Sequence, residues 1–178
     1  MGPVKPIYVR VPRTASGTFL AICGAEVRHV EHHWTAVEWR EREPAAWAAS
    51  MKFGFIRNPW DWAVSVYNSG IGLEPWPGSR IEPGDRPGIH RGQRTLMSFR
   101  EWLGQRRRIA LDWLTDTDGD IIVDEIRCYE DFVAALPADA PRENEARLVH
   151  YREWYDNASR LLVASRCARE IRIGGYEF

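Results

Sequence analysis

The chain has 178 residues, 44% of them hydrophobic and 28% charged, which is typical of one folded domain and not of a disordered segment. A formal net charge of -1 argues against a nucleic-acid binder and against attachment to an anionic membrane. The three cysteines form no CxxC pair, which argues against a disulfide framework or a zinc site. The N-terminus turns polar too early for a signal peptide, and no apolar run approaches the ~20 residues of a membrane span. We therefore expect a cytoplasmic protein.

Apolar runs, helical spacing and turn residues predict the secondary structure. In particular, Asn58 as an N-cap and Pro59 as the first helical residue are a strong helix start. The predicted elements in chain order are a strand at 6–11, a helix at 16–23, a strand at 25–30, a helix at 38–51, a strand at 53–56, helices at 58–68 and 99–107, a strand at 121–123, and helices at 130–136 and 158–171.

The alternation of strands and helices predicts an α/β fold with a mostly parallel central sheet and helices in layers on both faces, α/β/α. The whole chain, 1–178, is expected to form one domain. Residues 69–95 are rich in glycine, proline and arginine and predict a long loop, either a functional lid or a disordered segment.

The first candidate anion site is Pro12–Thr18, between the first predicted strand and helix. Its small residues would let backbone N–H groups approach an anion, and the helix start adds its positive dipole end. Arg13 supplies a full charge, and hydroxyls come from Thr14, Ser16 and Thr18. The alternative is an ordinary strand-to-helix turn with Ser16 as the N-cap.

The second candidate site follows the strand at 53–56. Arg57 stands at the end of that strand, the edge at which open α/β sheets bind ligands. Asp61 and Ser65 share one face of the next helix, so Arg57 and Ser65 could hold one phosphate between them. The alternative is an Arg57–Asp61 ion pair beside a surface serine. Two such sites at two strand ends together predict a nucleotide that carries two separated phosphate groups.

These stretches resemble the sulfotransferases that use 3′-phosphoadenosine 5′-phosphosulfate (PAPS). PRTASGT (12–18) is similar to their 5′-phosphosulfate loop, and RNPWDWAVSVY (57–67) is similar to their 3′-phosphate motif. Residues 112–132 and 150–178 resemble further segments of the carbohydrate-type enzymes. The resemblance implies the P-loop nucleotide-hydrolase-like sulfotransferase fold and sulfuryl transfer from PAPS to a hydroxyl acceptor, first a glycan or glycoside and next a small-molecule alcohol or phenol.

By this resemblance, the nucleotide PAPS, or its product PAP (adenosine 3′,5′-bisphosphate), would lie along both sites. The backbone of Thr14, Ala15, Ser16, Gly17 and Thr18 would hold the 5′-phosphosulfate, with Arg13 stabilising charge on the bridging oxygen. Arg57 and Ser65 would hold the 3′-phosphate, and Tyr129 would lie beside adenine, the alternative for Tyr129 being plain core packing. The resemblance implies no metal.

The acceptor hydroxyl needs a general base, and histidine is the natural choice near neutral pH. His33 fits the register of the related enzymes best, His32 is the near rival, and His90 in the predicted loop is a third candidate. The alternative for each is a surface or capping histidine.

Three departures from the family pattern leave other functions open. Arg13 replaces the usual lysine, Trp62 replaces a frequent arginine, and the chain is short for the family. A catalytically degenerate PAP-binding protein is therefore one alternative. A P-loop nucleotide kinase is another, although the chain lacks the Gly-Lys-Ser/Thr ending of an ATP-binding loop.

Overall fold

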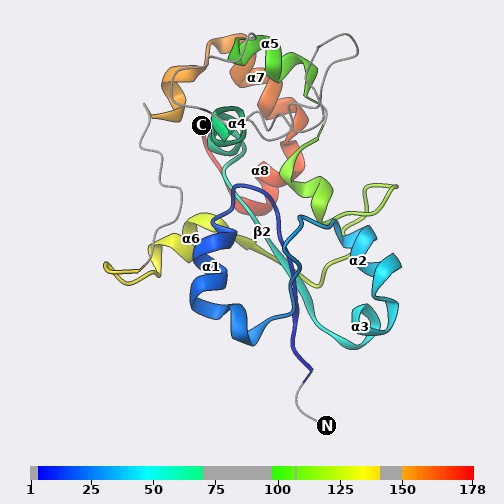
Figure 1. Cartoon of the computed structure of the whole chain (residues 1–178). Helices are drawn as coiled ribbons and strands as arrows, with labels where there is room; N and C mark the ends of the chain where they lie inside the picture. The colour runs from blue at the N-terminus through cyan, green and yellow to red at the C-terminus, as the bar shows by residue number, and fades with distance from the viewer. Residues whose placement is uncertain (1–3, 70–97, 107, 141–149) are drawn as a thin grey trace, which may run out of the picture.

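The structure is a computed structural model that describes residues 4–69, 98–106, 108–140 and 150–178 (Figure 1). The strands are β1 (Ile7–Val9), β2 (Lys52–Ile56) and β3 (Glu125–Cys128). The α-helices are α1 (Ser16–Cys23), α2 (Ala36–Arg42), α3 (Pro44–Ala49), α4 (Pro59–Ser69), α5 (Phe99–Gln105), α6 (Tyr129–Ala134), α7 (Asn157–Arg166) and α8 (Ala168–Gly174). Short 3₁₀ helices are η1 (Gly24–Glu26), η2 (Ala110–Trp113) and η3 (Tyr151–Trp154).

The strands form one parallel sheet in the order β1-β2-β3. Tyr8 lies opposite Phe53 in the first pair, and Ile56 lies opposite Cys128 in the second. Because all three strands run the same way, their carboxyl ends meet at one edge of the sheet. A mixed α/β fold with a parallel sheet, as the sequence predicts, is confirmed.

Helices pack on both faces of this sheet, because side chains alternate along each strand. On one face, Tyr8, Phe53 and Phe55 form an aromatic core with Phe19 of α1 and Phe132 of α6. On the other face, Ile7 and Val9 belong to a larger core to which α2, α3, α4, α5, η2 and α7 contribute. Figure 1 shows α1 and α6 on one side of β2, with α2 and α3 on the other.

Two predicted strands are wrong. Residues 24–26 form the 3₁₀ helix η1, and only Arg28 of the stretch 25–30 makes a parallel bridge, to Ile7. The run 121–123 is apolar because it packs in the core, where Ile121 forms one antiparallel bridge to Thr115. The true third strand begins after Asp124, whose N–H donates to the Lys52 carbonyl and whose carboxylate accepts from the Lys52 N–H at 2.7 Å. These bonds set the register of β3 beside β2.

Two long predicted helices are each divided. The stretch 38–51 breaks at Pro44, which lacks an N–H and disfavours helical geometry in the preceding residue, so α2 ends and α3 begins there. The stretch 158–171 divides at Cys167, whose φ of -103° and ψ of 22° lie outside the helical region.

The predicted helix at 58–68 is confirmed as α4, while most of the predicted loop 69–95 lies outside the described residues. None of the helices described is long and apolar enough to cross a membrane.

Candidate functional site

The loop Pro12–Thr18 leaves the carboxyl end of β1 in an unusual backbone conformation. Arg13 has a φ of 64° and Ala15 a φ of 53°, the left-handed region that side chains other than glycine rarely adopt. Such strain persists only where the surroundings impose it, and it is concentrated at ligand sites. The surrounding structure therefore holds the loop in a strained backbone conformation, which an ordinary strand-to-helix turn does not need.

Helix α1 begins directly from this loop without a side-chain cap. Its N-cap residue is Ala15, which has no oxygen to accept from the first turn, and that turn holds no acidic residue. The alternative with Ser16 as the N-cap is wrong, because Ser16 is already the first helical residue. A helix start of this kind favours an anion through its dipole and its backbone donors.

The three hydroxyls of the loop point inward. Thr14, Ser16 and Thr18 are buried, and the Thr14 hydroxyl donates to the Val11 carbonyl at 2.9 Å. Arg13, Ala15 and Gly17 alternate with them and remain partly exposed. The side of the loop that reaches solvent is thus formed by backbone and by the Arg13 guanidinium, and not by the hydroxyls that the sequence suggested.

The turn from β2 into α4 is fixed from several sides. The Asn58 carboxamide oxygen accepts from Trp60 N–H at 3.1 Å, as an N-cap does. The Asn58 N–H donates to the Glu130 carboxylate at 2.7 Å, and the Tyr176 hydroxyl donates to the same carboxylate at 2.8 Å. The C-terminal segment, β2 and α6 therefore together hold Arg57 in place.

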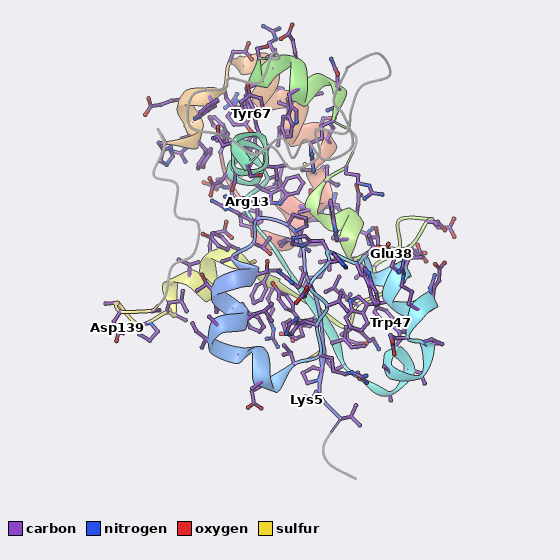
Figure 2. All side chains as sticks on the ribbon, viewed as in Figure 1. Lys5, Arg13, Glu38, Trp47, Tyr67 and Asp139 are labelled. Carbon is purple, nitrogen blue, oxygen red and sulfur yellow. The ribbon has the colours of Figure 1, made fainter. Side chains whose placement is uncertain are left out.

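Arg13, Arg57 and Ser65 meet above the sheet edge. Arg13 Nε donates to Ser65 Oγ at 3.0 Å, and Arg57 Nη1 reaches the same oxygen at 3.4 Å. Arg57 also donates from Nε and Nη2 to one oxygen of Asp61, at 2.8 and 2.6 Å. Figure 2 labels Arg13 between the starts of α1 and α4, where the two candidate sites form one cluster.

The charges in this cluster are unbalanced. Arg57 has the Asp61 carboxylate as its partner, but within the described residues no carboxylate pairs with Arg13. Burial lowers the pKa of Arg13, the Arg57 cation lowers it further, and Tyr129 opposes this. Two guanidinium groups beside one carboxylate leave a net positive charge, so the cluster suits an anion.

Tyr129 lies against the same cluster. It is the first residue of α6, and the Arg57 guanidinium carbon is 4.5 Å from the centre of its ring. This cation–π contact holds an aromatic face beside the two arginines. Tyr129 is partly exposed.

His33 is held against the carboxyl end of β1. Its Nδ1 lies 2.8 Å from the Arg10 carbonyl oxygen. Because a carbonyl only accepts, Nδ1 carries the hydrogen and Nε2 of the neutral ring is left as the acceptor. Loss of hydration lowers the pKa of His33, the Arg10 carbonyl opposes this, and the Arg10 and His32 charges lower it further. The imidazole is therefore neutral near pH 7, the form that a general base requires.

The other two histidine candidates differ from His33. His32 and His33 are both exposed, but the His32 ring makes none of the hydrogen bonds found among the described residues, whereas the His33 ring bonds the Arg10 carbonyl. His90 lies outside the described residues. The segment before His33 is positioned by Arg10, which donates from Nη1 to the carbonyls of Val30 and Glu31 at 2.9 Å each.

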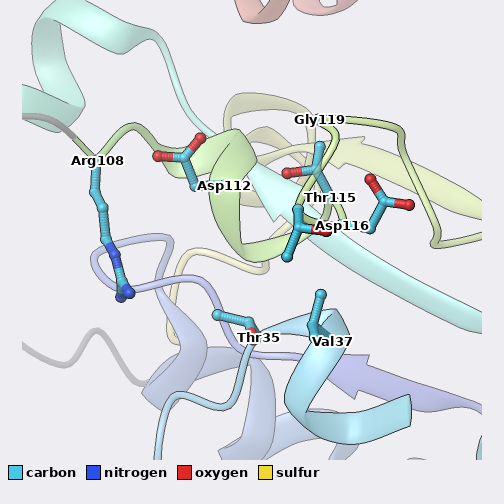
Figure 3. A pocket seen from close by; sticks show the side chains of 8 residues that line it. Thr35, Val37, Arg108, Asp112, Thr115, Asp116 and Gly119 are labelled. Atoms are coloured by element: carbon cyan, nitrogen blue, oxygen red, sulfur yellow. The ribbon is translucent and has the colours of Figure 1, made fainter. Parts of the chain in front are cut away.

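A pocket of about 390 Å³ lies between the start of α2 and the segment 108–119 (Figure 3). The Trp113 indole donates to the His33 carbonyl at 3.2 Å, and its neighbour Asp112 lines the pocket. Figure 3 shows Thr115 across from Thr35 and Val37 at the start of α2, with Asp112 and Asp116 on the same side as Thr115 and Arg108 at the edge. The sequence does not predict this pocket, because its walls come from segments far apart in the chain.

Trp62 has a role that its place in the sequence pattern did not reveal. Its indole donates to the Pro12 carbonyl at 2.8 Å, which ties α4 to the start of the loop. Trp62 is 3% exposed, so this bond is shielded from water.

Among the described residues no group of histidine, cysteine and acidic side chains could hold a metal ion. Comparison of the chain with models of known families, with curated proteins and with solved structures gives no match.

Proposed function

We propose that the protein is a PAPS-dependent sulfotransferase with the P-loop-like fold of that family. The observation that carries the proposal is the joining of Arg13 and Arg57 at Ser65 Oγ, beside an uncapped helix start. This arrangement fits a nucleotide with anionic groups at both ends, because guanidinium donors match the oxygens of phosphate and sulfate.

The proposal assigns a role to each part of the cluster. The loop backbone and the Arg13 guanidinium bind the 5′ end, where charge develops as the sulfuryl group leaves. Arg57 and Ser65 bind the 3′-phosphate, and the long 3.4 Å contact between them is one that a phosphate oxygen can replace. The Tyr129 ring stacks beside adenine. Arg57 keeps Asp61 as its counter-ion and stays oriented before the nucleotide arrives.

PAPS supplies the activated sulfuryl group. The sulfur forms a bond to the acceptor oxygen as the bond between the sulfur and the bridging oxygen of the 5′-phosphate breaks. His33 Nε2 takes the proton of the acceptor hydroxyl, while Nδ1–H stays on the Arg10 carbonyl and keeps the ring oriented. The pocket of Asp112, Thr115 and Thr35 is the place for the acceptor. Its hydroxyls and carboxylates suit the hydroxyl groups of a sugar, which supports a glycan or glycoside before a simple alcohol or phenol.

A PAP-binding protein without activity is the second candidate, and the replacement of lysine by Arg13 favours it. Arginine keeps the charge but does not act as a proton donor at neutral pH. The two functions share the nucleotide site and differ only in turnover.

The first test is calorimetric titration with PAP, with ATP and Mg²⁺ as the control. We expect PAP to bind with a dissociation constant of about 1 μM or better and ATP much more weakly, because only PAP carries a 3′-phosphate. An acceptor screen with radiolabelled PAPS then separates the enzyme from the inactive binder. Absence of PAP binding by a folded sample contradicts both, and tight ATP–Mg²⁺ binding favours a kinase.

A further inference from the structure

A second unpaired cation lies close to the loop. Arg106, the residue after α5, is half-buried, and its guanidinium carbon lies 5.0 Å from the Trp62 ring centre and 5.1 Å from that of Trp102. Its Nε donates to the Arg108 carbonyl at 3.0 Å. Within the part of the chain that the structure describes, no carboxylate forms an ion pair with Arg106. Burial and, second, the Arg108 cation together lower the pKa of Arg106 to about 10, while the Asp112 carboxylate opposes this.

The position of Arg106 is fixed by neighbouring contacts. Arg166 donates to the Arg106 carbonyl at 3.0 Å and to the Gly104 carbonyl at 3.1 Å, which clamps the end of α5. The indoles of Trp62 and Trp102, both 3% exposed, form the surface on which the guanidinium rests. A long side chain held in this way loses little further entropy when it binds a ligand.

Trp62 connects this cation to the loop. The ring on which Arg106 rests donates from Nε1 to the Pro12 carbonyl at 2.8 Å. Arg106 is thus one side chain away from the first residue of the loop. Arg57 and Ser65 form hydrogen bonds with Arg13, the next residue of the loop, so Arg106 and Arg57 are both linked to the start of the loop.

We propose that Arg106 is a third anion-binding residue, which contacts the phosphate or sulfate oxygens at the 5′ end of the bound nucleotide. The inference rests on the proposed function, since it concerns the same nucleotide site. A half-buried guanidinium without a carboxylate is costly unless an anion completes it. Two indole faces stabilise the cation in part and leave the edge of the guanidinium, with its N–H donors, for a ligand.

The test compares nucleotides that carry one phosphate or both. For Arg106→Gln we expect the affinity for PAP and for adenosine 5′-monophosphate to fall about 10- to 100-fold, the usual range for a lost charged hydrogen bond. Adenosine 3′-monophosphate has no 5′ group, so its affinity should change less than twofold. Arg106→Lys keeps the charge and should restore part of the loss.

The matched control is Arg42→Gln. Arg42 also rests on an indole, 4.9 Å from the Trp34 ring centre, but it lies at the end of α2. It should leave all three affinities unchanged. Equal weakening of 3′- and 5′-monophosphate binding by Arg106→Gln, together with a lower Tm, would assign Arg106 a structural role and overturn the inference. Unchanged PAP binding would also overturn it and leave the proposed function intact, whereas a wild-type protein that binds no PAP would overturn both.

Discussion

Arg57 donates a hydrogen bond of 3.1 Å from Nη1 to the backbone carbonyl oxygen of Arg13. The bond joins the end of β2 to the loop after β1, so the two stretches singled out in the sequence form one unit. It also helps to keep Arg13 in its left-handed conformation, at a φ of 64°. Arg57 therefore shapes the loop as well as supplying charge.

Arg57→Lys should weaken PAP binding about 10- to 100-fold, although the charge is kept. A lysine ammonium cannot reach Asp61, Ser65 and the Arg13 carbonyl together, as the planar guanidinium does. The measurement is calorimetric titration with PAP. Arg127→Lys is the control, since Arg127 pairs with Glu125 on β3 and should not affect binding. A dissociation constant equal to that of the wild type would show that charge alone is sufficient at position 57.

His33→Ala should leave PAP binding intact and reduce turnover about 10²- to 10⁴-fold, the usual contribution of a general base. Because the pKa of His33 lies below its ordinary 6.5, the acid limb of the pH–rate profile should fall below pH 6.5 and vanish in the variant. The measurement is initial rate against pH with an acceptor found in the screen. His32→Ala is the control and should keep both the rate and the limb. If His32→Ala instead lost the rate and the acid limb while His33→Ala kept both, His32 would be the base.

Glu170→Gln should stabilise the protein above pH 7. Glu170 is 1% exposed, and burial raises its pKa from 4.5 to about 7, against the opposing bonds from Leu111 N–H and Cys167. Between these values the unfolded carboxyl ionises while the folded one stays protonated, so folding stability falls as pH rises. The loss at pH 7 and above is about 3 kcal/mol.

The measurement for Glu170 is urea unfolding at several pH values. The wild type should lose stability from pH 4.5 to about 7, and Glu170→Gln should lack this slope, since glutamine still accepts from Leu111 N–H, 2.7 Å away in the wild type. Glu26→Gln changes an exposed carboxyl of η1 and should keep the wild-type slope. Parallel curves for the wild type and Glu170→Gln would contradict the raised pKa.

The sequence predicts local features of the site better than contacts between segments. Asn58 and Pro59 predict the start of α4, and the Arg57–Asp61 pair, which the sequence offers as the alternative to a phosphate site, does form, because both depend on short-range geometry. The Trp62 bond to Pro12 and the clamping of Arg106 join residues from distant parts of the chain. No periodicity or spacing reports such contacts.

The third strand is a case in which local pattern and tertiary structure disagree. The apolar run 121–123 has the composition of a strand, yet β3 is the more polar stretch Glu125–Cys128. The Lys52–Asp124 pair, with a 2.9 Å ion pair, decides which residues lie beside β2. A pairing partner 72 residues away cannot be inferred from the run itself.

Gly54→Ala should destabilise the sheet at the site's base. A Cβ at Gly54 would lie 2.4 Å from Leu114 Cδ2 and 3.1 Å from the Val9 carbonyl, and Leu114 is fully buried. Such overpacking costs about 1–3 kcal/mol, measured as the change in unfolding free energy in urea. Gly104→Ala is the matched control, because a Cβ there meets nothing within 4 Å and alanine favours the helix α5. We expect the control to gain up to about 1 kcal/mol, and an equal loss in both variants would contradict the steric argument.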